Sequence, residues 1–485
     1  MEKIRFGTDG WRDIIADNFN FENVRLAAFS IGKYVLDKAI TCNGIFIGYD
    51  NRFLSEDFAM QAGHALSSMG IKIYISDGSI PTPVTAFMVT DLKLDGAVMI
   101  TASHNPPKYN GIKFIPSYGG PADDKITKEI ENNLYFYISN ERERPDLINY
   151  DNFLNNINYI SNFSKYKKQL FKLVNTDLIK KSNLKIAADT MYGAGSKIMS
   201  EILQEELKLK AKIFNNYRDV LFGGKLPDPS EHNLEGLKDF VLSNKYDIGV
   251  ALDGDADRFG VIDSRGIFIS PNNTISLILY YLCTNSNLNY DGFEAVRTIA
   301  TTHLIDEICK KFNLKLIETP VGFKYIAQEM IKNNVIIGGE ESGGLSIYGH
   351  IPEKDGIIAD LLILEIQSFL KKNMNNISLS EYLDNIYKEF GYFYNERLDI
   401  KVPRKKIPLI INYFADFKNK KINNIKISEI LTKDGVKLIL ENKSWALIRA
   451  SGTEPLIRCY IESRDKNFFY NFKDYIKQII GSLIN

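Results

Sequence analysis

The chain has 485 residues, too many for one hydrophobic core, and at about 150 residues per domain it divides into roughly three to four domains. Its 45% hydrophobic and 25% charged residues are ordinary for a globular protein and exclude extensive disorder. Lysine plus arginine and aspartate plus glutamate both number 60, so the overall charge gives no indication of binding to nucleic acid or to an anionic membrane.

The N-terminal residues MEKIRFGTDGWR lack the apolar core of a signal peptide, and no run reaches the ~20 apolar residues that cross a bilayer. We therefore expect a cytoplasmic protein that binds neither membranes nor nucleic acid. The widely spaced cysteines form no CxxC pair, which favours buried free thiols over a zinc site or a disulfide framework. They are Cys42, Cys283, Cys309 and Cys459.

Short apolar runs recur along the chain, with helical stretches between them. Their continuous hydrophobicity predicts strands that are covered on both faces, as in α/β layers. The ligand of an open α/β sheet lies beyond the carboxyl ends of its strands, so the polar, glycine-rich loops GYDNR, TASHNP, DTMYGAG, LDGDADR and GGEESGG are where chemistry is expected. The predicted strands are residues 44–48, 96–100, 184–188, 248–252 and 335–338.

The later part of the chain changes in character. Residues 140–168 are polar and rich in asparagine, which predicts a linker with a connecting helix, and residues 371–377 predict a second linker. Past Ser378 an acidic, aromatic helix, a basic loop at 401–406 and short strands follow. This pattern predicts a separate α+β domain at the C-terminal end. Its predicted strands are residues 436–440 and 445–449.

The segment TASHNPPKYNGIK places Ser103 on a loop directly after a predicted buried strand. His104 and Lys113 bring a proton-transfer group and a fixed cation to the same neighbourhood. A serine hydroxyl is a weak nucleophile until a base or cation activates it, and phosphoryl transfer depends mainly on positioning and charge stabilisation. The alternative is a serine that caps the next helix, followed by prolines that shape a turn.

A second candidate site is the acidic loop that follows the strand at 248–252. Asp253, Asp255 and Asp257 alternate in sequence, and their hard oxygen ligands suit Mg²⁺. An EF-hand is excluded because its sixth and twelfth positions would be Arg258 and Ser264. A phosphatase of the haloacid-dehalogenase type, with Asp253 as nucleophile, and a solvated acidic turn both remain open.

Two further loops carry polar groups of the kind that bind sugars and phosphates. Glu340 and Ser342, in GGEESGG, pair well with sugar hydroxyls, and the glycines let the backbone approach a ligand. Arg449 and Arg458 flank a Ser-Gly-Thr turn whose donors match a phosphate. Ordinary glycine-rich and charged surface turns are the alternatives.

In this order the four motifs resemble the α-D-phosphohexomutase family of phosphoglucomutases and phosphomannomutases, from FGTDGWR to RASGTEP. The resemblance implies an α/β fold of three related α/β domains with mixed sheets and a smaller C-terminal α+β domain, arranged around a central cleft. The boundaries that follow are residues 1–160, 161–262, 263–375 and 376–485.

The resemblance also implies a role for each matching residue. Ser103 would be the phosphoserine, and one Mg²⁺ would be held by the three aspartates together with a phosphoserine oxygen. The positions that match the surroundings of the transferring group are Arg12, His104, Lys113 and Arg258. Those that match the sugar-binding and phosphate-binding loops are Thr319, Gly322, Phe323, Lys324, Glu340, Ser342, Arg449, Ser451, Gly452, Thr453 and Arg458.

The implied activity interconverts hexose 1-phosphate and hexose 6-phosphate, with hexose 1,6-bisphosphate as intermediate and activator, in a monomer or homodimer. The sequence has Glu341 and Gly344 where many phosphomannomutase-type members have a GEMSGH or GELSGH pattern, and it continues with HIPEKDG. This form is phosphoglucomutase-like, predicts a preference for glucose over mannose with glucosamine phosphate poor, and makes Lys354 a candidate acid or base. Phosphomannomutase or dual specificity, an aspartate-nucleophile phosphatase and a non-catalytic sugar-phosphate sensor are the alternatives.

Overall fold

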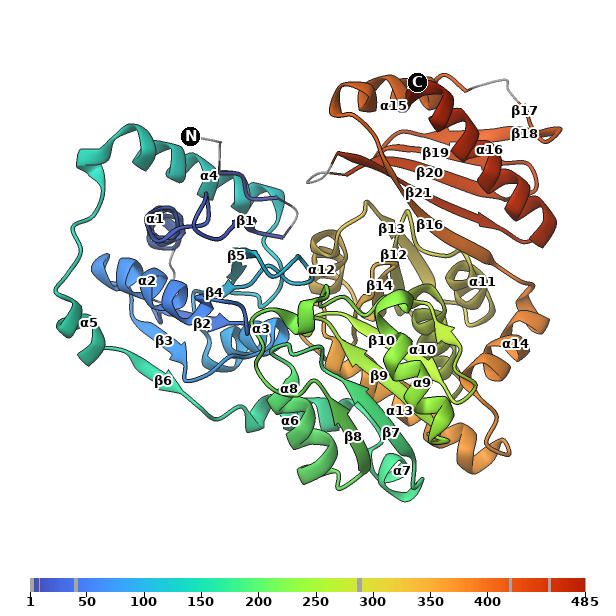
Figure 1. Cartoon of the computed structure of the whole chain (residues 1–485), viewed down its shortest axis with the longest axis horizontal. Helices are drawn as coiled ribbons and strands as arrows, with labels where there is room; N and C mark the ends of the chain where they lie inside the picture. Colours follow the sequence, from blue (N-terminus) through green and yellow to red (C-terminus); the bar gives the residue numbers. More distant parts are fainter. Residues whose placement is uncertain are drawn as a thin grey trace.

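The structure is a computed structural model that describes residues 4–7, 9–38, 42–285, 290–417, 421–451 and 455–484. Four β-sheets follow one another along the chain, each with its own helices (Figure 1). The first three sheets mix parallel and antiparallel strands, and the fourth is antiparallel throughout. The predicted fold class, three related α/β units and a C-terminal α+β unit, is confirmed.

The first unit has the strand order β1-β5-β4-β2-β3-β6. Its strands are β1 (Trp11–Ile14), β2 (Ile45–Tyr49), β3 (Ile73–Ser76), β4 (Gly96–Ile100), β5 (Tyr109–Pro116) and β6 (Asn158–Ile160). Its helices are α1 (Phe21–Lys38), α2 (Ser55–Ser68), α3 (Thr82–Leu92), α4 (Asp124–Ser139), the 3-10 helix η1 (Glu141–Glu143) and α5 (Tyr150–Asn155).

The second unit has the strand order β11-β10-β9-β7-β8. Its strands are β7 (Lys185–Asp189), β8 (Lys210–Phe214), β9 (Ile248–Leu252), β10 (Phe259–Asp263) and β11 (Phe268–Ile269). Its helices are α6 (Ser164–Leu173), α7 (Thr176–Lys181), α8 (Ser196–Ser200), the π-helix η2 (Glu201–Glu206), the 3-10 helices η3 (Phe222–Gly224) and η4 (Glu231–Leu234), and α9 (Glu235–Ser243).

The third unit has the strand order β13-β12-β14-β15. Its strands are β12 (Glu294–Thr298), β13 (Lys315–Thr319), β14 (Val335–Glu340) and β15 (Gly344–Ile347). The helices of this part of the chain are α10 (Pro271–Asn285), α11 (Leu304–Lys311), α12 (Phe323–Lys332), α13 (Gly356–Asn373) and α14 (Leu379–Phe390).

The fourth unit has the strand order β16-β21-β20-β19-β18-β17. Its strands are β16 (Tyr394–Lys401), β17 (Lys421–Ile422), β18 (Ile425–Leu431), β19 (Val436–Leu440), β20 (Trp445–Ala450) and β21 (Leu456–Ser463). Its helices are the 3-10 helix η5 (Arg404–Lys406), α15 (Ile407–Ala415) and α16 (Lys466–Ile484).

The first three units repeat one topology. Each contains three parallel strands, of which the first is central, and a fourth strand that returns antiparallel beside the third, giving β5-β4-β2-β3, β10-β9-β7-β8 and β15-β14-β12-β13. The turn between the third and fourth strands of each unit carries one predicted motif. The serine loop (TASHNPPKY), the aspartate loop (DGDAD) and the GEES loop (GGEESGG) therefore occupy equivalent places in the three units.

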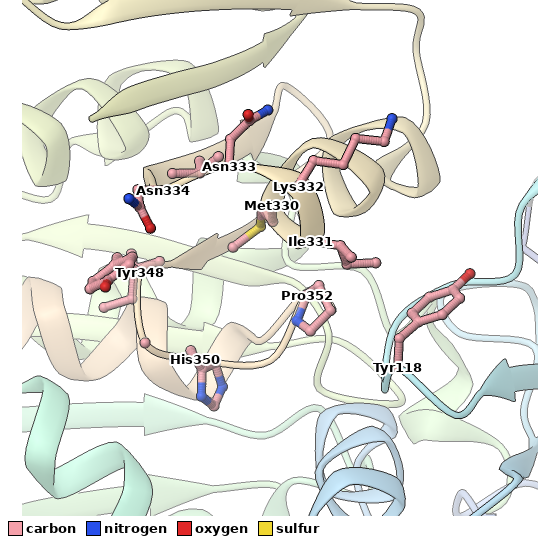
Figure 2. A pocket seen from close by; sticks show the side chains of 12 residues that line it. Tyr118, Met330, Ile331, Lys332, Asn333, Asn334, Tyr348, His350 and Pro352 are labelled. Atoms are coloured by element: carbon pink, nitrogen blue, oxygen red, sulfur yellow. The ribbon is translucent and has the colours of Figure 1, made fainter. Parts of the chain in front are cut away.

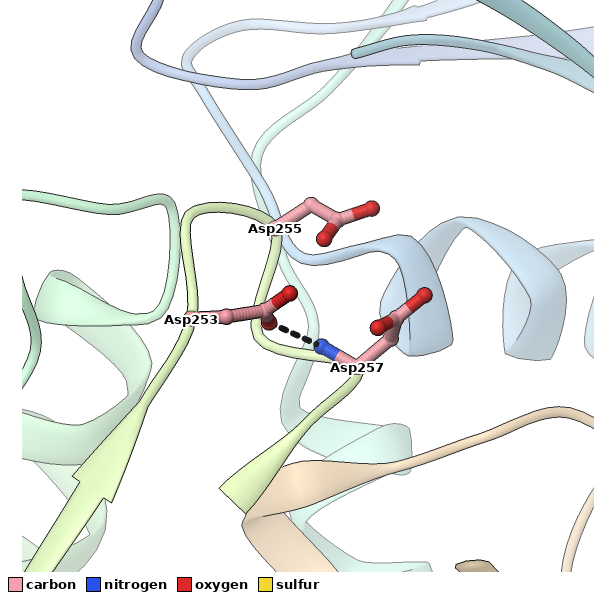
Figure 3. Close-up of side chains that lie close together, drawn as sticks. All are labelled: Asp253, Asp255 and Asp257. Atoms are coloured by element: carbon pink, nitrogen blue, oxygen red, sulfur yellow. Dashed lines mark hydrogen bonds between the residues drawn. The ribbon is translucent and has the colours of Figure 1, made fainter. Parts of the chain in front are cut away.

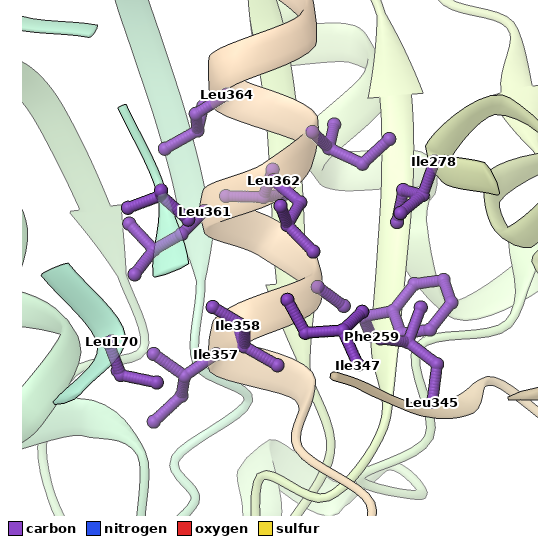
Figure 4. Close-up of a cluster of buried hydrophobic side chains, with 14 of the residues drawn as sticks. Leu170, Phe259, Ile278, Leu345, Ile347, Ile357, Ile358, Leu361, Leu362 and Leu364 are labelled. Atoms are coloured by element: carbon purple, nitrogen blue, oxygen red, sulfur yellow. The ribbon is translucent and has the colours of Figure 1, made fainter. Parts of the chain in front are cut away.

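A single hydrophobic core joins these three units around α13. Most of this helix is buried, and most of its buried residues are apolar, which is typical of a helix packed on every side. Figure 4 shows its side chains against Leu170 of α6, Phe259 of β10 and Ile347 of β15. The fourth unit contacts the third through a smaller apolar cluster in which Trp445 meets Ile299.

The five strands predicted from apolar runs are confirmed as β2, β4, β7, β9 and β14, as are β19, β20 and the helix past Ser378. The predicted linker at 140–168 also contains β6, a short edge strand that lies parallel to β3. The second predicted linker begins inside the last turn of α13, where Lys371 and Lys372 complement the helix dipole. The domain boundaries at 160, 262 and 375 stay predictions.

All four cysteines lie in the described part of the chain as free thiols. Cys309 and Cys459 are buried, whereas Cys42 is exposed, so the expectation of burial is wrong for Cys42, which lies just before β2. Among the described helices, none combines the length and the apolar character needed to cross a membrane.

Candidate active site

Ser103 lies in the turn between β4 and β5 and is almost completely buried. Its φ of 52° is in the left-handed region, which is uncommon for a residue with a side chain. The Ser103 hydroxyl donates to Oδ2 of Asp253 at 3.1 Å and lies 3.4 Å from Nδ1 of His104. The serine of the first unit therefore directly contacts the aspartate loop of the second.

The three aspartates converge in the turn between β9 and β10 (Figure 3). All are buried, and one oxygen from each lies within 4.8 Å of the others. Burial, together with the charges of Asp255 and Asp257, raises the pKa of Asp253 well above its usual range. Within the described part of the chain, Oδ1 of Asp255 and Oδ1 of Asp257 have no hydrogen-bond partner. Buried carboxylate oxygens without donors fit a hard divalent cation such as Mg²⁺.

Two buried lysines lie beside the aspartates. Lys113 on β5 places its Nζ 3.0 Å from Oδ2 of Asp255 and 2.9 Å from Oδ2 of Asp9, and Lys354 places its Nζ 3.0 Å from Oδ2 of Asp257. Burial disfavours both ammonium groups, but the surrounding carboxylates raise the pKa of Lys113 and of Lys354 above the ordinary lysine value. Both side chains are therefore cations beside the aspartate loop.

The other predicted residues around Ser103 are also present. Arg12 on β1 donates to Oδ1 of Asn105 at 3.0 Å and to Oδ2 of Asp9 at 3.1 Å. Arg258 follows the aspartate loop, with its Nε 3.9 Å from Oδ1 of Asp257. Burial, and then the charges of Arg258 and Arg12, lower the pKa of His104 well below its usual value, so its imidazole is neutral.

The GEES loop of the third unit begins at the end of β14. Ser342 donates its hydroxyl proton to Oε1 of Glu340 at 2.6 Å. Glu340 is buried, and burial raises the pKa of its carboxyl. This hydroxyl and carboxyl therefore form one polar unit in the turn that corresponds to the serine and aspartate loops.

The second predicted sugar-binding segment joins β13 to α12. Thr319 ends the strand, and Gly322 has a φ of 128°, a conformation that favours glycine. Phe323 packs into the apolar cluster beneath α12. Lys324 contacts the first unit, with its Nζ 2.5 Å from Oδ1 of Asp124. The side chains of Phe323 and Lys324 are thus engaged within the protein.

Gly344 and Lys354 are packed so closely that they restrict each other. A Cβ atom at position 344 would overlap Cδ of Lys354 and lie 2.7 Å from its Cγ. Heavy atoms that close cannot coexist without a shift of the lysine stem. The glycine that departs from the phosphomannomutase-type pattern therefore makes room for Lys354.

The predicted phosphate loop connects β20 to β21. Arg449 is directly opposite Arg458 in this antiparallel pair, and Arg449 donates through Nε to Oδ1 of Asp434 at 2.8 Å. Oδ2 of Asp434 accepts the backbone N–H of Val321, in the sugar-binding segment of the third unit, at 2.8 Å. Ser451 donates its backbone N–H to the carbonyl of Leu456. The remaining predicted residues of this loop, Gly452 and Thr453, lie outside the described residues.

Several residues of the site were not predicted individually. Asp9, in FGTDGWR, contacts three of the predicted cations. Glu353 is buried beside Lys354, and burial raises the pKa of its carboxyl to about 8. Both lie in motifs that carry the family resemblance. Glu353 directly precedes Lys354 and Asp9 lies three residues before Arg12, so nearness in sequence to a predicted cation could have identified both. Arg52 lies in the predicted GYDNR loop but was not singled out, and Asp434 carried no signal in the sequence.

A separate cavity of about 410 Å³ lies at the edge of the third unit (Figure 2). Its described lining contains none of the predicted site residues, although Pro352 belongs to the segment that leads to Lys354. The lining residues are Tyr118, Met330, Ile331, Lys332, Asn333, Asn334, Val335, Ile347, Tyr348, Gly349, His350 and Pro352.

A serine beside buried aspartates, together with opposed arginines on another unit, forms a site suited to phosphoryl groups. Models of the phosphoglucomutase/phosphomannomutase family match the chain in four consecutive parts. Alpha/beta/alpha domains I, II and III match residues 3–138, 159–266 and 270–390, and the C-terminal domain matches 399–477. The chain therefore belongs to the phosphoglucomutase/phosphomannomutase family, whose members are phosphomutases, a class of isomerase.

Individual relatives extend over nearly the whole chain. A phosphoglucomutase/phosphomannomutase of Thermococcus kodakarensis is 31% identical and covers 95% of each chain. A phosphoglucosamine/phosphogalactosamine mutase of Sulfurisphaera tokodaii is 30% identical and covers 98% of each. A solved structure from Thermus thermophilus, described as a phosphomannomutase, is 28% identical, covers 99% of each chain and has a TM-score of 0.82.

Proposed function

We propose that the chain interconverts hexose 1-phosphate and hexose 6-phosphate through a phosphoserine at Ser103, with glucose phosphates preferred. The observation that carries this proposal is the contact between the Ser103 hydroxyl and Asp253, inside a buried group of aspartates and lysines. A phosphoryl group on Ser103 would lie between a divalent-cation site and fixed ammonium groups. That environment favours phosphoryl transfer, because transfer relies on positioning and on compensation of oxygen charge.

The proposed reaction has two half-reactions. In the first, the bond between phosphorus and Oγ of Ser103 breaks while phosphorus bonds to the free sugar oxygen, and the proton that this oxygen loses ends on Oγ, which leaves as a hydroxyl. The product is a hexose 1,6-bisphosphate. In the second, Oγ of Ser103 loses its proton and bonds to the other phosphoryl group, and the sugar oxygen left behind gains that proton. Lys354, an ammonium group, is assigned to stabilise the sugar oxygen while its proton moves, because Gly344 leaves room for the lysine stem beside the aspartate loop.

Asp253, Asp255 and Asp257 are assigned to one Mg²⁺, together with an oxygen of the phosphorylated Ser103. When bound, this ion would withdraw negative charge from the transferring phosphoryl oxygens. Lys113, on β5 of the first unit, forms ion pairs with Asp255 and Asp257. The other cations that face the serine loop are Arg12 and Arg258, and His104 supplies a neutral imidazole.

The phosphate that does not react is assigned to the fourth unit. Arg449, Ser451 and Arg458, with Gly452 and Thr453 of the same loop, supply the phosphate donors. Glu340, Ser342 and the segment that includes Thr319, Gly322, Phe323 and Lys324 are assigned to the sugar. Because Phe323 and Lys324 are engaged elsewhere, the main chain of this segment is proposed to meet the sugar hydroxyls.

Two classes of sugar phosphate are candidates for the substrate. The GEES loop followed by HIPEKDG supports glucose, with mannose phosphate as a slower substrate and hexose 1,6-bisphosphate as activator. Hexosamine phosphates are the second candidate, since relatives are named for phosphoglucosamine and phosphogalactosamine. The buried carboxyl of Glu340 also offers a partner for an ammonium-bearing sugar.

The test compares glucose, mannose and glucosamine 1-phosphates, each with its 1,6-bisphosphate, and follows sugar phosphates and inorganic phosphate by ³¹P NMR. We expect the highest kcat/KM for glucose 1-phosphate, little phosphate release, and loss of nearly all turnover in Ser103→Ala. A highest value for glucosamine 1-phosphate would reassign the sugar. Phosphate release that persists in Ser103→Ala would instead indicate a phosphatase with Asp253 as nucleophile.

A further inference from the structure

Arg52 lies in the GYDNR loop directly after β2, and its side chain is completely buried. All five of its side-chain N–H donors are used. Nε donates to Oδ2 of Asp50 at 3.0 Å, and the other four donors reach main-chain carbonyls of the serine loop. These carbonyls are Pro106 at 2.9 Å and Tyr109 at 3.0 Å from Nη1, and Ser103 at 2.5 Å and Asn105 at 2.8 Å from Nη2.

Asp50 holds the same loop from its other side. Oδ2 of Asp50 accepts the hydroxyl proton of Thr101 at 2.6 Å, and the Thr101 oxygen accepts the backbone N–H of Ser103 at 2.8 Å. The Asp50–Arg52 pair therefore reaches both the N–H and the carbonyl of Ser103. Charged groups are stable in a protein interior only when they are paired and fully hydrogen-bonded, and Asp50 and Arg52 meet both conditions.

The hydrogen bonds of Arg52 and Asp50 stabilise a backbone conformation at Ser103 that residues with a side chain seldom adopt. Ser103 has a positive φ, and its hydroxyl is directed at Asp253 of another unit. A serine loop without the four guanidinium bonds would relax toward ordinary backbone angles. A lysine at position 52 could not make these hydrogen bonds, because one ammonium group cannot present five donors in a planar fork.

The second unit covers the guanidinium group from outside. The ring centre of Phe222 lies 5.0 Å from Cζ of Arg52. Five residues along, the carbonyl of Pro227 accepts the backbone N–H of Gly254 inside the aspartate loop at 3.1 Å. One segment of the second unit therefore contacts both Arg52 and the loop that contains Asp253.

We propose that Arg52 is a positioning residue that fixes the phosphorylated Ser103 against the aspartate loop, an inference that rests on the proposed function. Arg52 does not touch the sugar phosphate. Its loss should lower kcat and leave the KM for glucose 1-phosphate nearly unchanged, because the assigned sugar and phosphate ligands belong to the third and fourth units.

The test uses Arg52→Lys, Arg52→Ala and Thr101→Val, the last of which removes only the link from Asp50 to the N–H of Ser103. We expect kcat per phosphorylated chain to fall about 100-fold in Arg52→Lys, as for a misplaced reacting group, with KM within about threefold of wild type. Free guanidinium, at concentrations that do not unfold the protein, should restore turnover of Arg52→Ala about tenfold or more.

Arg297→Lys is the matched control, since Arg297 is equally buried and donates to Asp306, Glu318 and the Thr298 carbonyl, away from Ser103. This control should lower the melting temperature without the selective loss of kcat. If Arg52→Lys fails to fold, Thr101→Val must show the same selective loss. Unchanged kcat in the folded variants, or a matching rise in KM, would overturn the proposal.

Failure of the proposed function itself would look different. Intact-mass and peptide analysis of the wild-type protein treated with glucose 1,6-bisphosphate should find one phosphoryl group, on Ser103. Absence of phosphoserine together with turnover in Ser103→Ala would refute the carrier role. A phosphorylated wild type with fully active Arg52 variants would refute only the role of Arg52.

Discussion

Arg449 on β20 and Arg458 on β21 occupy directly opposite positions in an antiparallel pair. Like charges in such a pair destabilise a sheet unless anions lie beside them, and Asp399 on β16 is directly opposite Arg458 on its other side. Asp434 accepts from Nε of Arg449, a contact on one edge of the guanidinium that orients its other edge for a ligand. The pair therefore favours a phosphate anchor that recognises the phosphate and not the sugar.

Arg449→Ala should weaken binding of glucose 1-phosphate and glucose 6-phosphate equally. Loss of a charged hydrogen-bond donor corresponds to about 10-fold to 100-fold in Kd. Release of glucose 1,6-bisphosphate during turnover should also rise, because the intermediate loses its anchor while it reorients. Calorimetric titration and product analysis measure both effects, with Arg464→Ala, a surface arginine paired with Glu307, as control. Unchanged Kd for both monophosphates would assign the anchor elsewhere.

Asp255→Asn should weaken Mg²⁺ binding by about 10-fold to 100-fold, since it removes one charge from the buried group of aspartates. It also removes a carboxylate that faces Lys113 at 3.0 Å, so turnover should fall with the affinity. Titration of Mg²⁺ without substrate provides a readout that does not depend on activity. Asp247→Asn, at a surface pair with Lys371, is the control. Full activity of the wild type in excess chelator would contradict a metal role.

The sequence was sufficient for the α/β layers because continuous apolar runs mark strands that are covered on both faces. It was insufficient for β6, because Asn158–Ile160 forms no continuous apolar run and the strand depends on its pairing with β3. The sequence marked the GYDNR loop but not the role of Arg52, since its acceptors are main-chain carbonyls about fifty residues away that carry no side-chain pattern. Glu353 directly precedes Lys354, whereas only the fold brings Asp9 near this lysine.

The close packing of Gly344 against Lys354 makes a prediction that depends on size alone. Gly344→Ala should destabilise the protein by about 1–3 kcal/mol through overpacking and lower kcat by displacing the lysine. Gly236→Ala is the matched control, because it lies on α9 with open space and should be neutral or stabilise the helix by about 0.5–1 kcal/mol. Thermal unfolding and steady-state kinetics separate the two effects. Wild-type kcat in Gly344→Ala would show that the lysine does not need this space.

Asp360, on the buried helix α13, supplies a prediction about stability and pH. In the described part of the chain neither carboxylate oxygen has a hydrogen-bond partner, and burial, followed by the charge of Asp355, raises the pKa of Asp360 well above its usual value. The folded protein therefore keeps the proton on Asp360 at a pH where the unfolded chain has released it. Stability is lost as the pH rises above the ordinary aspartate range near 3.8.

Asp360→Asn removes this titration, so the gain in melting temperature over wild type should grow from pH 4 toward neutral pH. Asp360→Leu also removes the unpaired polar atoms and should stabilise the protein further at neutral pH, by about 1–3 kcal/mol before any cost of the larger side chain. Scanning fluorimetry across this range checks both, with Asp239→Asn on the exposed face of α9 as the control that should show no pH-dependent gain. A constant difference between Asp360→Asn and wild type at every pH would show that Asp360 ionises normally in the folded protein.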